Sequence, residues 1–235
     1  MPHRPRKRFG QNFLVDAASI QEIIEAINPR PGERVVEIDR DLARRLRAEF
    51  SAQRVTVHEQ DALDFDFAAL GSGLRIVGNL PYNISTPLLF HLARYTSAIR
   101  DVHVMLQREV VERMVARPSS SDYGRLSVMI QYRFELELLM TIPPSAFRPA
   151  PKVESAVVRM TPFERLPYCA RDEGWFGRIV TAAFSQRRKT LRNALKGYFH
   201  ADDFSRLGID AQQRPQDLGV AEFVRLADRA AESGP

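Results

Sequence analysis

The sequence predicts an α/β fold, in which a mostly parallel sheet covered on both faces by helices is followed by a small C-terminal helical domain. Two observations support this prediction. As far as residue 162, short apolar runs typical of buried strands alternate with segments of helical period. From residue 163 onward the strand pattern stops and only helical patterns remain. The change predicts one domain at residues 1–162 and a second at 163–235.

The individual elements follow from apolar spacing and from turn residues. Strands are predicted at residues 34–38, 54–58, 74–78, 102–106, 134–140 and 153–160. Helices are predicted in the first domain at residues 20–27, 39–50, 88–95, 110–115 and 124–132, and in the second at 175–185, 188–198, 202–207 and 220–232. Ser19 and Glu22 have the spacing of a capping box at the start of the first helix.

Bulk composition excludes several classes of protein. A hydrophobic fraction of 44% and a charged fraction of 27% are ordinary for a globular chain. No apolar run approaches the length that crosses a bilayer, and the basic N-terminus has no apolar region behind it, so neither a membrane span nor a secretory signal is expected. The single cysteine, Cys169, fits a reducing cytoplasm and excludes a disulfide framework or a cysteine-based zinc site. The five histidines show no ligand spacing, so no metal is expected.

Basic residues are concentrated in two places. The net charge of +5 is by itself a weak sign of an anionic partner. The distribution of the basic residues is a stronger sign of such a partner, because two clusters of them contain no acidic residue. The first consists of Arg4, Arg6, Lys7 and Arg8, and the second of Arg187, Arg188, Lys189, Arg192 and Lys196. Two such clusters on an otherwise mixed surface predict contacts with a phosphate backbone.

The segment from Gly78 to Tyr82, which reads GNLPY, follows directly on an apolar strand. The carboxyl end of a parallel strand is where open α/β sheets bind ligands. Asn79 offers an amide, Pro81 keeps the Leu80 carbonyl out of a regular ladder, and Tyr82 offers a flat face. Two carbonyl acceptors beside an aromatic plane suit the exocyclic amine of a stacked base. A simple proline turn with a capping asparagine would have the same residues, and the short segment alone favours that interpretation.

The wider context favours the first interpretation, because the chain closely resembles the ribosomal RNA adenine N6-dimethyltransferase family over nearly its whole length. The resemblance is carried by KRFGQNFL at 7–14, QDA at 60–62, GNLPYNISTP at 78–87, YGRLS at 123–127, PPSAF at 143–147, PKVESAV at 151–157 and AFSQRRKT at 183–190. The bacterial small-subunit enzyme is more similar than the relatives that modify the large subunit. An N6-adenine DNA methyltransferase shares only the corner that contains Asn79 and Tyr82, and is less favoured.

The resemblance implies a Rossmann-like methyltransferase sheet, S-adenosylmethionine as the methyl donor, and two adjacent adenines near the 3′ end of 16S rRNA in an immature small subunit as the substrate. The target amine would be held by Asn79 and Leu80, and the target base would lie between Tyr82 and Phe147. The cofactor would be bound by Asn12, Leu14, Glu37, Asp61 and Asn79. The RNA would be bound by Arg6, Lys7, Arg8, Arg187, Arg188, Lys189 and Arg192. A monomer is expected.

The sequence departs from the family at one place. No glycine occurs between Gly32 and Gly71, so the glycine-rich cofactor loop after the first strand is absent. Val35-Val36-Glu37-Ile38 runs straight into Asp39, so that a loop, a helix and one strand, roughly 25 residues, are missing. Glu37 matches the end of either strand that flanks this gap, and in the second strand it would be the ribose-binding acid. We expect a damaged cofactor pocket, and the strands on either side of the gap would either pair anew or expose a sheet edge.

Two interpretations of the chain remain open at this point. It is either an active methyltransferase whose printed sequence lacks this segment, or a catalytically impaired RNA-binding or ribosome-assembly relative of that enzyme. The basic clusters and the helical domain are present in both cases. No general base is expected in the first case, because methyl transfer to a neutral amine depends mainly on in-line positioning.

Overall fold

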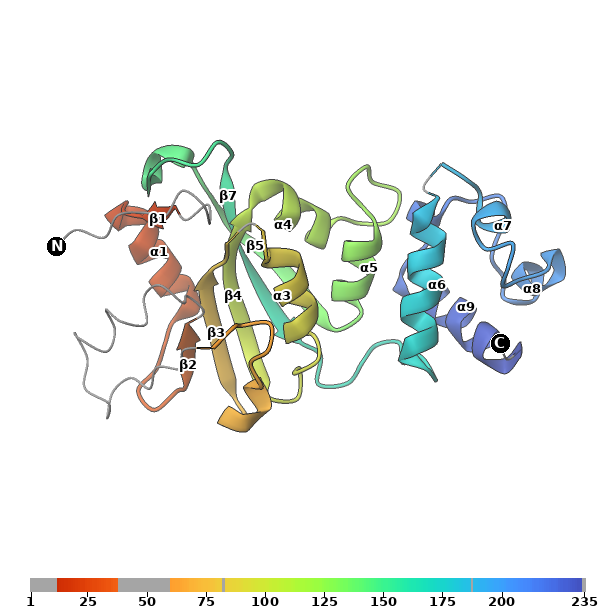
Figure 1. Cartoon of the computed structure of the whole chain (residues 1–235), viewed down its shortest axis with the longest axis horizontal. Coiled ribbons are helices and arrows are strands. Elements are labelled where there is room, and N and C mark those ends of the chain that lie inside the picture. Colours follow the sequence, from red (N-terminus) through yellow and green to blue (C-terminus); the bar gives the residue numbers. More distant parts are fainter. Residues whose placement is uncertain (1–11, 38–59, 82, 187, 234–235) are drawn as a thin grey trace. The chain divides into compact units, whose positions relative to one another are not determined.

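The computed structural model of the chain describes residues 12–37, 60–81, 83–186 and 188–233 (Figure 1). The chain divides into two compact units. The sheet unit comprises Met1–Val111 and Glu135–Pro162, and the helical unit comprises Glu112–Phe134 and Phe163–Pro235. The chain thus passes between units at residues 162 and 163, where the sequence predicts a boundary. Residues 112–134, which the prediction assigned to the first domain, group with the helical unit.

The sheet unit is built on a five-stranded mixed sheet. Its order is β2 (Val35–Glu37), β3 (Leu74–Asn79), β4 (Ile99–Gln107), β7 (Ser155–Pro162) and β5 (Phe134–Ile142). The first three strands are parallel, whereas β7 runs antiparallel to β4. The predicted α/β class is confirmed, and the antiparallel pair makes the sheet mixed. Short helices α3 (Ser85–Leu92) and α4 (Arg108–Val115) follow β3 and β4, as parallel crossovers require.

The core of the sheet unit lies around the central strands. Six consecutive residues of β4, from Asp101 to Leu106, are buried, and Leu74 and Ile76 of β3 are fully buried. Neighbouring residues of a strand point to opposite faces, so both faces of β4 are covered. This covering accounts for the apolar residues of β3 and β4, whereas Arg75, Asp101 and His103 on the same strands are buried polar or charged residues.

Among the described residues, β2 forms one edge of the sheet. β2 has three residues, and no other described strand pairs with its outer side. Val35 on this strand is 46% exposed. Helix α1 (Ala17–Ile27) has no buried residue, and its apolar Ile20 and Ile24 are 37% and 47% exposed. Apolar surface in these places is what we expect where a strand and a helix are missing. The predicted helix at 39–50 and strand at 54–58 lie outside the described residues.

Smaller elements complete this unit. They are β1 (Phe13–Leu14), η2 (Phe67–Leu70), η3 (Pro144–Ala146) and β6 (Phe147–Arg148). Helix α1 is capped by Asp16, whose carboxylate accepts a hydrogen bond from the backbone N–H of Ser19. The predicted capping box of Ser19 and Glu22 is therefore wrong by one turn, since the helix begins at Ala17.

The helical unit is held together by a core between α6 (Glu173–Ser185) and α9 (Val220–Ser233). Around them lie α5 (Arg125–Gln131), α7 (Leu191–Ala194), α8 (Ala201–Arg206) and η4 (Pro215–Asp217). The predicted helix at 188–198 is wrong in extent, because only residues 191–194 are helical. The backbone N–H groups of Leu191 and Arg192 donate to Gln213 and Ala211, which starts the helix there.

Candidate active site

The residues that follow β3 lie at the carboxyl end of the parallel strands, as the sequence predicts. The side-chain Nδ2 of Asn79 donates to the backbone oxygen of Asn12 at 2.8 Å. Leu80 is 1% exposed, and its N–H donates to the oxygen of Met105 at 3.1 Å. Asn79 is half-buried and stands opposite Met105 in the register with β4. The corner is therefore fixed on one side by β4 and on the other by the segment that contains Asn12.

The short ribbon formed by β1 and β6 brings two further predicted residues to this end of the sheet. Leu14 and Phe147 are register partners in the antiparallel ribbon, and the N–H of Val15 donates to the oxygen of Ala146 at 2.9 Å. Leu14 packs against an apolar cluster that includes Phe147 and Met105. Asn12, Leu14, Asn79 and Phe147 thus lie in one neighbourhood, although the sequence separates them widely.

Phe147 is the member of this group whose surroundings differ most from the prediction. Its side chain is 1% exposed and packs in a cluster with Met105, Ile142, Ala146 and Val157. A ring buried to this extent has no face open to a base in the described structure. Its contribution here is to core packing, and its role in stacking on the target base stays a prediction.

Other predicted residues are placed differently. Glu37 is the last residue of β2 and pairs with Val77 of β3. It therefore lies at the carboxyl end of the parallel strands, as Asn79 does. This pairing places Glu37 on a strand directly beside β3. Asp61 lies in an exposed turn, where its carboxylate accepts a local hydrogen bond from the N–H of Leu63 at 3.0 Å. Tyr82, Arg6, Lys7, Arg8 and Arg187 lie outside the described residues.

The backbone around β2 contains no glycine turn of the kind that cradles a nucleotide-like cofactor. Gly32, with φ of +88°, lies before the strand, and the next glycine in the chain is Gly71. Dinucleotide-type sites need glycine just after the strand, because a side chain there would keep the backbone away from the ligand. The carboxyl end of β2 therefore offers the Glu37 side chain but no glycine.

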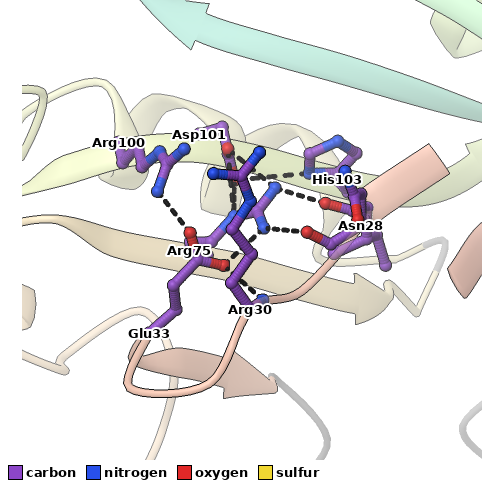
Figure 2. Close-up of polar contacts among 8 residues, drawn as sticks. Asn28, Arg30, Glu33, Arg75, Arg100, Asp101 and His103 are labelled. Carbon is purple, nitrogen blue, oxygen red and sulfur yellow. Dashed lines mark hydrogen bonds and ion pairs between the residues drawn. The ribbon is translucent and has the colours of Figure 1, made fainter. Parts of the chain in front are cut away.

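A buried charge cluster near the opposite end of β3 was not anticipated from the sequence (Figure 2). The guanidinium of Arg75, whose side chain is 6% exposed, donates to Asp101 at 3.0 Å and to Glu33 at 2.8 Å. It also donates to the oxygens of Ile27 and Asn28, at the end of α1. Arg75 therefore ties α1 and the loop before β2 to β3 and β4. An arginine within an otherwise apolar strand was the signal that could have revealed it.

The cluster shifts the pKa values of both carboxylates in the same direction. Burial alone would raise the pKa of Asp101, but its interactions with His103 and Arg75 outweigh burial and hold that pKa below its usual value. The pKa of Glu33 is lowered, first by the hydrogen bond from the backbone of Arg30 and then by that from Arg75. Both groups are therefore ionised at neutral pH. Because the cluster lies away from Asn79, its role is structural.

Basic residues of the predicted RNA-binding cluster lie on the surface of the helical unit. Arg188 and Lys189 are exposed between α6 and α7, and Arg192 is exposed on α7. None of the three forms an ion pair within the described residues. Their charges are therefore available to an external anion.

The described parts of the chain contain neither a membrane-spanning helix nor a metal site. No helix there has both the length and the apolar character to span a membrane. No three histidine, cysteine, aspartate or glutamate side chains there are grouped as a metal site would require.

Comparison with known proteins places the chain in a family. The sequence matches the family described as "Ribosomal RNA adenine dimethylase" over residues 2–38 and again over residues 33–232. It is 54% identical to "Ribosomal RNA small subunit methyltransferase A" of Nitrosospira multiformis, covering 97% of each chain. It is 53% identical to the protein of that name from Laribacter hongkongensis, covering 99% of this chain and 98% of the relative.

Solved structures agree on the fold. A dimethyladenosine transferase from Plasmodium falciparum superimposes with a TM-score of 0.75 at 22% identity, covering 91% of this chain and 95% of that one. The 23S rRNA methyltransferase ErmE superimposes with a TM-score of 0.70 at 22% identity, covering 94% of this chain and 100% of that one. Both likenesses support the Rossmann-like methyltransferase fold.

The family match also bears on the missing segment. Its two parts overlap at residues 33–38, so the residues of β2 match the family pattern twice. The alignments with the two relatives run over 251 and 257 residues, which is more than the 235 residues of this chain. The relatives therefore contain residues that have no counterpart here. With a match over nearly its whole length, the chain belongs to the ribosomal RNA adenine dimethylase family.

Proposed function

We propose that the chain dimethylates N6 of two adjacent adenines near the 3′ end of 16S rRNA in immature small subunits, with S-adenosylmethionine as the methyl donor. Membership of the family and the names of the relatives support the reaction and the small-subunit substrate. The structural observation that carries the proposal is the position of Asn79, half-buried at the carboxyl end of β3 and hydrogen-bonded to Asn12. The protein would act as a monomer in the cytoplasm.

The amide of Asn79 is oriented for a specific task. Because its Nδ2 donates to Asn12, its Oδ1 is left on the other side of the amide as an acceptor. The N–H of Leu80 is taken up by Met105, and Pro81 follows it with no N–H of its own. We assign Asn79 Oδ1 and the Leu80 carbonyl as acceptors for the two N–H groups of the target amine. Holding both would favour the pyramidal nitrogen that attacks a methyl group.

Methyl transfer to the target amine requires few other catalytic groups from the protein. Transfer of a methyl group to a neutral amine is mainly a matter of bringing two reactants into line. Carbonyl groups can achieve this without changing their protonation state, so no titrating side chain is required at the corner. Tyr82 and Phe147 are assigned to the two faces of the target base. For Phe147 this requires a rearrangement that opens its ring, which is 1% exposed.

The residues of this chain supply only part of a binding site for S-adenosylmethionine. Asn12, Leu14, Glu37 and Asp61 are the side chains and backbone segments that we assign to it. A cofactor site on such a sheet also depends on backbone N–H groups at a glycine turn and at the following helix N-terminus. The chain has no glycine between Gly32 and Gly71. The residues present therefore lack the backbone part of the site.

This misfit supports a second candidate function. The chain would then be a catalytically impaired RNA-binding or ribosome-assembly relative of the enzyme. The observation that favours it is the glycine-free junction of Glu37, Ile38 and Asp39. The exposed basic residues of the helical unit are compatible with both functions.

One experiment separates the two functions. Small subunits that lack the methyl groups would be incubated with radiolabelled S-adenosylmethionine and one of three proteins. These are the 235-residue chain, a version carrying the missing segment of the Nitrosospira multiformis relative, and that version with Asn79→Ala. The first function predicts label in rRNA with the 235-residue chain and with the restored version, and none with Asn79→Ala. Label with the restored version but none with the 235-residue chain, while both bind the particles, would favour the second.

A further inference from the structure

Two aromatic rings and a guanidinium gather on the surface of the helical unit. Trp175 and Arg178 are one turn apart on α6, and Cζ of Arg178 lies 3.9 Å from the centroid of the Trp175 ring. Tyr198 meets Trp175 edge-on, with ring centroids 6.3 Å apart and an interplanar angle of 88°. Trp175 packs partly against the core of the unit, whereas Tyr198 is 39% exposed and Arg178 is also exposed. The group is therefore anchored on one side and open to solvent on the other.

The charges around this group are unevenly neutralised. Ion pairs within the described part of the helical unit involve Arg133, Arg171, Arg225 and Arg229. In the same part of the chain, no ion pair is formed by Arg178, Arg188, Lys189, Arg192 or Lys196. The acids at the start of α6 are engaged, since Asp172 caps the helix and Glu173 pairs with Arg133. Among the described residues, basic side chains without an ion pair thus include those on α6 and in the segment that follows it, besides Arg117, Arg206 and Arg214 elsewhere in the unit.

Arg178, Arg188, Lys189, Arg192 and Lys196 lie on α6, on α7 and in the segments that follow each of the two helices. Helices α6 and α7 pack together, and Figure 1 shows α7 beside α6. Trp175 and Arg178 lie in the first half of α6, and Arg188 and Lys189 follow its end. A helix rises about 1.5 Å per residue, so the aromatic and basic ends are separated by roughly 15 Å. A ligand that contacts both ends must span this distance, which several consecutive nucleotides can do and a single small anion cannot.

We propose that Trp175, Arg178 and Tyr198 form a site for an unpaired nucleotide of the rRNA, next to the phosphate contacts of Arg188 and Lys189. This inference rests on the proposed RNA-binding function. The base stacks on the exposed ring of Tyr198, and the guanidinium of Arg178, which lies over the indole ring, donates to an adjacent phosphate. Stacking requires a base that is not already paired, so the site selects single-stranded RNA over duplex.

The chain offers a direct probe of this site, because Trp175 is its only tryptophan. Fluorescence of Trp175 would be followed during titration with a single-stranded RNA, and separately with a duplex of the same charge. Anisotropy of labelled RNA would report total binding in parallel. We expect the single strand to quench Trp175 with the same midpoint as the anisotropy change. The duplex should change the anisotropy without quenching.

Substitutions sharpen the test. Tyr198→Ala should weaken single-strand binding about tenfold, the loss expected for one stacked base, whereas Tyr198→Phe should retain it. Tyr168→Ala is the matched control, because Tyr168 is a 51% exposed tyrosine of the same unit with no ring contact among the described residues. It should leave the affinity unchanged.

Two outcomes would overturn the site and leave the RNA-binding function standing. One is saturable RNA binding by anisotropy with no change in Trp175 fluorescence. The other is equal affinity of the Tyr198→Ala and Tyr168→Ala variants. Absence of any anisotropy change with the unmodified chain would instead refute the RNA-binding function, and the site with it.

Discussion

Replacing Arg75 with methionine should destabilise the sheet unit far more than replacing any exposed arginine. Arg75 lies 6% exposed between two carboxylates and two helix-end carbonyls (Figure 2). The methionine side chain has a comparable length but no charge and no donor. Asp101 and Glu33, whose side chains are 12% and 13% exposed, would lose their shared partner. The cost arises from these stranded groups rather than from lost packing.

The magnitude follows from the burial. Breaking a buried ion pair by removing one partner costs about 3–5 kcal/mol, because the other charge stays uncompensated. For a chain of this size, that corresponds to a fall in melting temperature of roughly 10 °C. Arg100→Met is the matched control, since Arg100 pairs with the same Glu33 but is 54% exposed. An exposed pair contributes about 1 kcal/mol or less.

Thermal unfolding followed by circular dichroism would measure both variants, and pH adds a second criterion. The folded-state pKa values of Asp101 and Glu33 are lowered, so their stabilisation is present above the unfolded values of about 4 and is lost as pH falls through the folded values. The difference between the unmodified chain and Arg75→Met should be full at neutral pH and shrink below about pH 4. Equal melting temperatures for Arg75→Met and Arg100→Met at neutral pH would refute the reasoning.

Three further changes test the site and the RNA surface. Asn79→Ala should abolish methylation in any version that has activity and cost only about 1 kcal/mol of stability, so parental activity in a methylation assay would contradict the role of the amide. Phe147→Ala should lower the free energy of unfolding by about 3 kcal/mol, because the ring is 1% exposed, and denaturant titration showing a loss well under 1 kcal/mol would mean that it does not pack as described. Replacing Arg188 and Lys189 with alanine should weaken binding to small-subunit particles and flatten its dependence on salt, and an unchanged salt slope would show that the two charges meet no phosphate.

Much of the fold could be predicted from local pattern. β3 and β4 each contain a short apolar run, at residues 76–77 and 104–106, and such runs favour a buried strand. Helix boundaries were harder to predict. The cap of α1 is Asp16 rather than Ser19, because the helix begins earlier than its first isoleucine. The helix at α7 is short, because its first N–H groups bond to a distant segment that no local pattern reveals.

The candidate site shows the same limit more strongly. Asn12 and Asn79 are 67 residues apart in the chain, and their hydrogen bond could be anticipated only through the family resemblance. The burial of Phe147 depends on residues of three strands that meet only in the folded chain. Arg75 escaped the prediction for a related reason, since its partners come from separate segments. The absence of glycine between Gly32 and Gly71, by contrast, can be seen in the sequence itself, and the family resemblance gives it the meaning of a missing loop.

The most direct test of the central claim is calorimetric titration of S-adenosylmethionine into two proteins, the 235-residue chain and the version with the missing segment restored. Losing several backbone contacts of about 1 kcal/mol each should raise the dissociation constant by about two or more powers of ten. We therefore expect the restored version to bind the donor. The 235-residue chain should bind it with a dissociation constant roughly a hundredfold higher. Equal affinity of the two proteins would contradict the account, because it would mean that a complete donor site forms without a glycine turn after β2.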